Sequence, residues 1–155
     1  MEAIWASVVA VTGTLLGSVI THTFQRLASD RGELFARSEA LRQERITAYS
    51  AFAEAVEDYR HGQADRWYRK QETPAGDAFI AARDEAHRLR TAARQALYRV
   101  MLLTDTPEVN IAAERAYECT REISNAQDQA GRDTRDAQAK RAIADFVSRA
   151  SPLVR

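Results

Sequence analysis

The chain has few of the residues that break or cross-link a fold. Its 155 residues include one cysteine, three prolines and six glycines. The single cysteine, Cys119, cannot form an internal disulfide, and no metal-binding motif surrounds it, which agrees with a reducing compartment. Scarce proline and glycine leave few positions at which a helix must end. The single cysteine excludes small folds that are held together by disulfides or by a cysteine-rich zinc site.

Sequence motifs for catalysis are also missing. There is no glycine-rich phosphate loop, no G-x-S-x-G and no C-x-x-C, and Cys119 has no histidine near it in sequence. The formal net charge is +0, so no broad attraction for nucleic acid is encoded. We therefore expect a protein without catalytic activity, cofactor or metal, and without direct nucleic-acid binding.

Charged residues are absent from Ala3 to Phe24. At a rise of ~1.5 Å per residue, a helix of this length is about 33 Å long, enough to cross a hydrocarbon core of roughly 30 Å. The sequence predicts a transmembrane anchor over residues 1–25. A cleaved signal peptide fits less well, because no basic residue precedes the apolar stretch and Val19 and Ile20 make a poor cleavage site. A buried or interfacial helix is the remaining alternative, although the stretch has no polar face.

Basic residues on one side of the predicted anchor indicate its orientation. No lysine or arginine precedes it, whereas four arginines follow: Arg26, Arg31, Arg37 and Arg42. The positive-inside rule then predicts a single-pass protein of the cell membrane, with the N-terminus outside and the C-terminal domain in the cytoplasm.

Small residues recur at every fourth position of the predicted anchor. Gly13 and Gly17 form a G-x-x-x-G pair, which Ala6 and Ala10 extend. Such residues let two helix backbones approach closely in lipid. They are candidates for packing of the transmembrane helix, and a homo-oligomer formed through this helix or the segment after it is one expectation.

The rest of the chain predicts an all-α fold. A charged helical stalk is expected over residues 26–45 and a helical bundle over 46–155. The first helix should run to about Gln71, followed by a turn at residues 74–76 and a second helix to about Leu103. Thr106 and Pro107 predict the start of a third helix, and a last helix is expected after a polar run around Gly131. Short connections make neighbouring helices antiparallel, so we expect a three- to four-helix up-and-down bundle.

Apolar residues at spacings of three and four mark the expected buried faces. On the first soluble helix these are Tyr49, Phe52, Val56, Tyr59 and Trp67; on the second, Phe79, Ala82, Ala86, Leu89, Ala93, Ala96, Leu97, Val100 and Leu103; on the third, Val109, Ala112, Ala116, Cys119 and Ile123; on the last, Ile143, Phe146 and Val147.

Two D-x-x-H pairs resemble the carboxylate–histidine pairs of di-iron helical bundles. Asp58 pairs with His61, and Asp84 with His87. Each aspartate follows an expected core residue by two positions, which is about 200° around a helix. These side chains should point away from the bundle axis, and we expect solvated pairs rather than a metal site.

Cations and aromatic rings alternate near the end of the first soluble helix, at Arg66, Trp67, Tyr68, Arg69 and Lys70. Such mixtures can stack bases or grip phosphates. A structural explanation is also open, in which Trp67 closes the end of the core and the basic residues complement the helix C-terminus. This cluster is a candidate patch for a partner.

Three stretches carry a family resemblance: IWASVVAVTGTLLGSVITHTFQR, LRQERITAYSAF and DEAHRLRTAARQAL. With these the chain resembles small actinobacterial membrane proteins of the KilB-like group, named after a plasmid-spread protein. The resemblance implies a membrane-associated accessory protein linked to conjugative plasmid transfer, and it carries over no functional residues.

Two functions follow as expectations. The first is a membrane-anchored helical scaffold that binds an unknown protein partner or itself and has no catalytic activity. The alternative is an accessory protein for conjugative plasmid transfer or spread, which sits in the lipid bilayer and acts through a protein partner.

Overall fold

The computed structural model describes the backbone of residues 2–155 and the side chains of residues 35–155. It contains the helices α1 (Glu2–Glu72), α2 (Asp77–Leu103), α3 (Pro107–Arg121) and α4 (Gln129–Ala150), with short 3₁₀ helices η1 (Ile123–Asn125) and η2 (Ser151–Val154). No strand occurs in this part of the chain. The all-α prediction is confirmed, and the predicted helix ends near Gln71 and Leu103 lie within one residue of the observed ends.

The predicted anchor, with Ala6, Ala10, Gly13 and Gly17, lies outside the residues whose side chains are described. Among the described side chains, from residue 35 onwards, no helical segment is both long enough and apolar enough to cross a bilayer. The chain divides into two units, residues 1–41 and residues 42–155.

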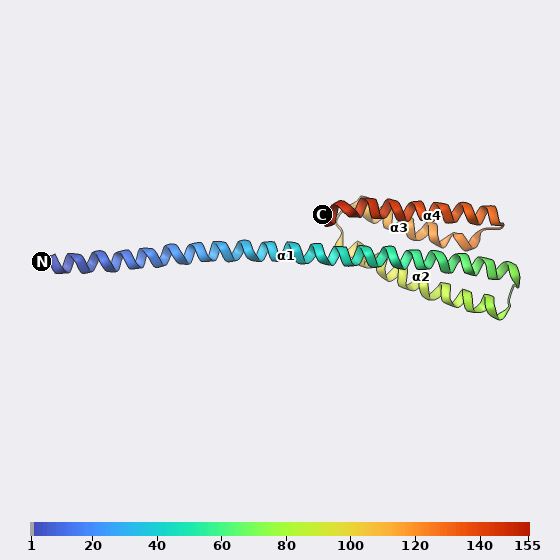
Figure 1. Cartoon of the computed structure of the whole chain (residues 1–155), viewed down its shortest axis with the longest axis horizontal. Helices are drawn as coiled ribbons and strands as arrows, with labels where there is room; N and C mark the ends of the chain where they lie inside the picture. Colours follow the sequence, from blue (N-terminus) through green and yellow to red (C-terminus); the bar gives the residue numbers. More distant parts are fainter. Residues whose placement is uncertain (1) are drawn as a thin grey trace. The chain divides into compact units, whose positions relative to one another are not determined.

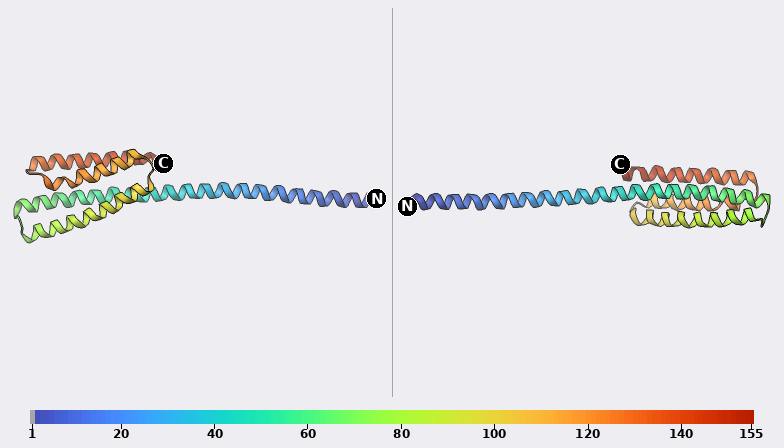
Figure 2. Two further views of the ribbon diagram at one scale, coloured as in Figure 1. Left: turned by 180° about the vertical axis from the view of Figure 1, so that it is seen from behind. Right: turned by 60° about the horizontal axis from the view of Figure 1, so that its bottom comes forward.

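The second unit is an up-and-down bundle of four helices (Figure 1). The α1–α2 turn and the α3–α4 connection lie at one end, and the α2–α3 connection and the C-terminus at the other, as a second pair of views also shows (Figure 2). Ala75 in the first turn has a φ of 68°, a left-handed conformation that reverses the chain tightly.

Aromatic side chains fill the centre of the bundle. The rings of Phe52 and Phe146 meet edge to face with centroids 4.8 Å apart, and both side chains are fully buried. Tyr59 and Tyr117 pack with centroids 5.8 Å apart, which joins α1 to α3. Such contacts stabilise the fold by burying large apolar surfaces in favourable ring geometry.

A buried ion network joins α1 to α4. Arg60 binds Asp136 through a short hydrogen bond and Glu57 at 2.7 Å, while Lys140 lies 3.2 Å from Asp136. Burial opposes ionisation of Asp136, but hydrogen bonds from Arg60 and Lys140 outweigh it, so the pKa of this carboxyl lies below its ordinary value. The hydrogen bond from Arg60 also lowers the pKa of Glu57.

Polar contacts fix the α2–α3 connection against α1. The Tyr49 hydroxyl lies 2.8 Å from Thr104 Oγ1, and Arg45 Nε donates to the Leu103 carbonyl at 2.9 Å. The α3 helix begins where the sequence predicts, with Thr106 at the N-cap position and Pro107 first in the helix, although the Thr106 hydroxyl makes no capping bond. Arg45, assigned by the sequence to the end of the stalk, therefore contributes to the compact unit.

The last helix differs most from the expectation. The α4 helix already begins at Gln129, inside the run expected to be polar and irregular, and Asp128 caps it by accepting a 2.7 Å bond from the Gly131 N–H. Phe146 is fully buried as expected, but Val147 is 48% exposed. The reason is that Ala139, Ala142 and Phe146 define the inward face, and Val147 lies about 100° away from Phe146.

Candidate functional site

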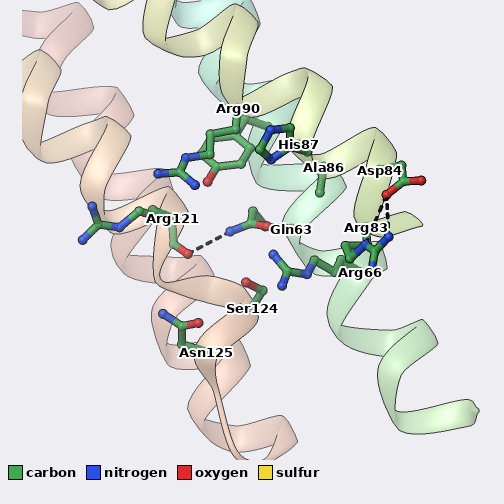
Figure 3. Close-up of a pocket in the computed structure, with 11 residues that line it drawn as sticks. Gln63, Arg66, Arg83, Asp84, Ala86, His87, Arg90, Arg121, Ser124 and Asn125 are labelled. Carbon is green, nitrogen blue, oxygen red and sulfur yellow. Dashed lines mark hydrogen bonds and ion pairs between the residues drawn. The ribbon is translucent and has the colours of Figure 1, made fainter. Parts of the chain in front are cut away.

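A cavity of about 470 Å³ opens between α1, α2 and the end of α3 (Figure 3). Four arginines line it together with a single carboxylate. The lining side chains are Tyr59, Gln63, Arg66, Arg83, Asp84, Ala86, His87, Arg90, Arg121, Ser124 and Asn125.

Gln63 lies in the wall of this cavity on the inward face of α1. Its side chain is 2% exposed, and its Nε2 donates to the Arg121 carbonyl at 2.8 Å. Its Oε1 is buried and has no hydrogen-bond partner within the described residues. An unsatisfied buried acceptor destabilises a fold by about 1–3 kcal/mol, so this atom marks a place where a donor is missing.

The four arginines differ in how far their charge is neutralised. Arg83 lies 3.1 Å from Asp84, and Arg121 lies 2.7 Å from Glu118. Arg66 is half-buried and forms no ion pair with any of residues 35–155, and Arg90 contacts no carboxylate there. Arg66 and Arg90 therefore give the cavity its unbalanced positive charge.

The ionisation states of two further groups follow from their contacts. Arg90 Nε donates to the Tyr117 hydroxyl at 3.3 Å, which raises the pKa of Arg90 and keeps its guanidinium charged. Burial, with a smaller contribution from Tyr117, raises the pKa of Tyr59 to about 12, so its hydroxyl stays protonated. The cavity is thus cationic at any physiological pH.

A second cavity of about 460 Å³ adjoins the first towards the α1–α2 turn. The two share Arg66, Ser124 and Asn125, and the second adds Lys70, Gln71, Phe79, Ala126 and Gln127. Together they form a groove, here called the cationic groove, that follows α1 from Tyr59 to Gln71.

The predicted patch at residues 66–70 divides into inward and outward parts. Trp67 is 5% exposed and donates from Nε1 to the Ala126 carbonyl at 2.8 Å, and the Arg132 guanidinium lies 4.5 Å from the Tyr68 ring centroid. Arg69 pairs with Asp65 at 3.5 Å and with Glu72 at 3.0 Å. Only Arg66 and Lys70 reach the cationic groove.

The two D-x-x-H pairs point outward, as the sequence predicts. Asp58, His61, Asp84 and His87 are all exposed. Asp84 and His87 line the rim of the first cavity, whereas Asp58 and His61 do not. Within residues 35–155, no three histidine, cysteine or acidic side chains converge as a metal site would require.

Sequence reasoning missed Gln63, Arg90 and Arg121. A signal for Gln63 was present: it lies four residues after Tyr59 and four before Trp67, so a polar side chain occupies the buried stripe. Arg90 and Arg121 offered no comparable signal, because arginine is frequent on every helix and only packing brings these two to one cavity.

The KilB plasmid transfer protein family model matches residues 46–154. This chain belongs to the KilB family. The matched region comprises the α1 segment from Ile46 onwards and nearly all of the remaining bundle, so the groove lies wholly within it. The search of curated proteins found no match, and neither did the search of solved structures.

Proposed function

We propose that this KilB-family protein is a non-catalytic accessory protein of plasmid transfer, and that it acts by binding a protein partner through its helical bundle. The observation that carries the proposal is the match of the KilB plasmid transfer family to residues 46–154, which is the bundle itself. It favours the second of the two functions expected from the sequence over a scaffold of unspecified process.

The form of the bundle supports a binding role. Its centre is closed by aromatic packing, while the cationic groove stays open beside it and carries unbalanced charge. Unpaired cations in a groove are suited to recognition of an acidic partner rather than to fold stability. A formal net charge of +0 for the whole chain argues against nucleic acid as that partner.

The uncharged stretch from Ala3 to Phe24 supports action at the membrane. In this proposal residues 1–25 anchor the protein, and the arginines after the anchor keep the bundle in the cytoplasm. A partner would therefore be recruited to the inner surface of the cell membrane.

Disrupting the gene and measuring the frequency of plasmid transfer to plasmid-free recipients tests the process. Transfer should fall, and expression of the whole chain should restore it. A chain starting at Ser29 should accumulate as folded helical protein and fail to restore transfer, because it lacks the anchor. Unchanged transfer in the disrupted strain would contradict the proposal.

Reporter fusions after Arg155 test the topology. A reporter that works only in the cytoplasm should be active, and one that works only outside the cytoplasmic membrane should be silent. Extraction of the whole chain by carbonate would contradict the anchor, and activity of the external reporter would contradict the orientation.

A further inference from the structure

We propose that the cationic groove binds an extended acidic segment of a partner protein, with two carboxylates separated by one residue. This inference rests on the proposed function, because it names the surface and the chemistry through which the bundle would recognise its partner. It concerns one groove and one class of ligand, and so can fail by itself.

The cationic groove carries positive charges that lack carboxylate partners among the described residues. Arg66 extends from α1 towards Gln63 and Ser124, whereas the Arg121 guanidinium points away from Gln63 and is paired with Glu118 (Figure 3). Lys70, further along the groove, forms no ion pair with residues 35–155. Arg66, Lys70 and Arg90 thus present three cations along the groove, each lacking a carboxylate that an acidic ligand would supply.

The groove also contains a buried hydrogen-bond acceptor without a partner in the described part of the chain, Gln63 Oε1. Gln63 Nε2 is held by the Arg121 carbonyl, which fixes the amide so that Oε1 remains the atom without a partner. A ligand that satisfies it must bring an N–H or O–H donor. A peptide carries such a donor on its backbone at nearly every residue, whereas a fully ionised phosphate has none.

The spacing of the cations along α1 matches the spacing of alternate side chains in an extended peptide. Arg66 and Lys70 are one turn apart on α1, about 6 Å along the axis. In an extended peptide, alternate residues lie about 6.6 Å apart and face the same side. Carboxylates at positions i and i+2 would therefore meet these two cations in turn. The groove follows α1 from Tyr59 to Gln71, about 18 Å, which is the length of about five extended residues.

The same features disfavour a single-stranded nucleic acid. Base stacking needs exposed aromatic faces, but of the two aromatic side chains that line the groove, Tyr59 is 1% exposed and Phe79 is half-buried.

Fluorescence anisotropy with the full-length chain in detergent tests the proposal. The probe is a labelled six-residue peptide in which aspartate alternates with alanine, and the comparison is its isomer Asp-Asp-Ala-Ala-Asp-Ala, in which no two aspartates are separated by one residue. The alternating peptide should bind at least about threefold more tightly. Binding should also shift the NMR signals of the Gln63 side-chain amide.

Two variants locate the binding. Arg66→Gln removes an unpaired cation and should weaken binding of the alternating peptide at least about tenfold, since a charge-assisted bond contributes that much. Arg141→Gln is the matched control, because Arg141 is exposed on α4 and lines a different cavity; it should change the affinity less than about twofold.

Equal loss in both variants, or equal affinity for the two isomers, would reduce the binding to non-specific attraction and overturn the proposal. So would a thymidine oligonucleotide or inorganic pyrophosphate that binds more tightly than the peptide and depends on Arg66. Failure of peptide binding with normal plasmid transfer by Arg66→Gln would reject the groove alone. The frequency of plasmid transfer after gene disruption is measured separately, and that measurement tests the proposed function.

Discussion

The α1 helix meets its neighbours in two contrasting ways. Towards α4, the ring of Phe52 packs against Phe146, and Arg60 forms an ion pair with Asp136. Against α2 and the end of α3 it leaves two adjoining cavities, an arginine without a described partner and an unsatisfied Gln63 oxygen. In the first interface the buried charge of Arg60 is satisfied within the chain, although Arg132 Nε beside Tyr68 is buried without a hydrogen-bond partner from the described residues. In the second, the Gln63 oxygen has no hydrogen-bond partner and Arg66 has no ion-pair partner among residues 35–155.

This difference separates residues that hold the fold from residues that are free to serve recognition. Buried groups whose partners lie within the chain should affect folding strongly when they are changed. Groups that lack partners should affect folding weakly and binding strongly.

Phe146→Ala should have the largest effect on stability. The ring is fully buried against Phe52, and truncating a buried phenylalanine to alanine costs about 3–5 kcal/mol. Urea unfolding followed by circular dichroism measures the loss. Val147→Ala is the neighbouring control; because Val147 is 48% exposed, it should cost about 0.5 kcal/mol or less. Similar losses in the two variants would contradict the facing of α4.

Asp136→Ala should come next. It leaves Arg60, which is 6% exposed, with Glu57 as its remaining carboxylate. Breaking a buried ion pair costs about 3–5 kcal/mol, and the retained Glu57 places this case at about 3. Lys140→Ala removes the exposed partner of the same aspartate and should cost less than about 1 kcal/mol. A larger loss for Lys140 than for Asp136 would contradict the burial of the network.

The same network predicts acid destabilisation. The pKa values of Asp136 and Glu57 are lower in the folded state than their ordinary values, so their contribution is complete above the unfolded pKa of about 4 and is lost as pH falls through the folded values. The free energy of unfolding should decrease between about pH 5 and pH 2. Asp136→Asn should flatten this decrease and leave the pH dependence above pH 5 unchanged; an equal slope in both proteins would exclude Asp136 as a cause.

These two interfaces were not equally readable from the sequence. The spacing of Phe52 and Val56 indicated the buried face of α1, and Pro107 indicated the start of α3. The Arg60–Asp136 pair was not predictable, because the two residues are 76 positions apart and each resembles an ordinary surface charge. The start of α4 was missed since alanines such as Ala139 carry a weak periodic signal.

The groove was harder still to predict. It depends on which helices pack together and on where their packing leaves space, and no local pattern encodes an empty volume. Gln63 on a buried stripe was the one local sign, and it indicates an unusual position without naming Arg90 or Arg121 as neighbours. The cluster of cations and aromatic rings at residues 66–70 indicated the correct end of α1, but only two of its five residues reach the groove.

Gly62→Ala tests how closely α1 and α2 approach beside the groove. A methyl group at Gly62 would lie 2.6 Å from Leu89 Cδ1, so the Leu89 side chain must move. Replacing glycine by alanine in a helix stabilises by about 1 kcal/mol, and this gain should offset the repacking and leave stability within about 1 kcal/mol of the parent. In a Leu89→Ala background the clash is absent, and the same change should stabilise by about 1 kcal/mol.

Arg66→Gln should have the smallest effect and the opposite sign. Arg66 lies in one cavity with Arg83, Arg90 and Arg121 and forms no ion pair with residues 35–155. Removing its charge relieves repulsion, so the free energy of unfolding should rise by up to about 0.5 kcal/mol at low salt. Salt screens this repulsion, and the difference between variant and parent should shrink as salt is raised to about 1 M. Urea unfolding at two salt concentrations measures it. A destabilisation comparable to that of Asp136→Ala would mean that Arg66 holds the fold, and the contrast between the closed and open interfaces would no longer stand.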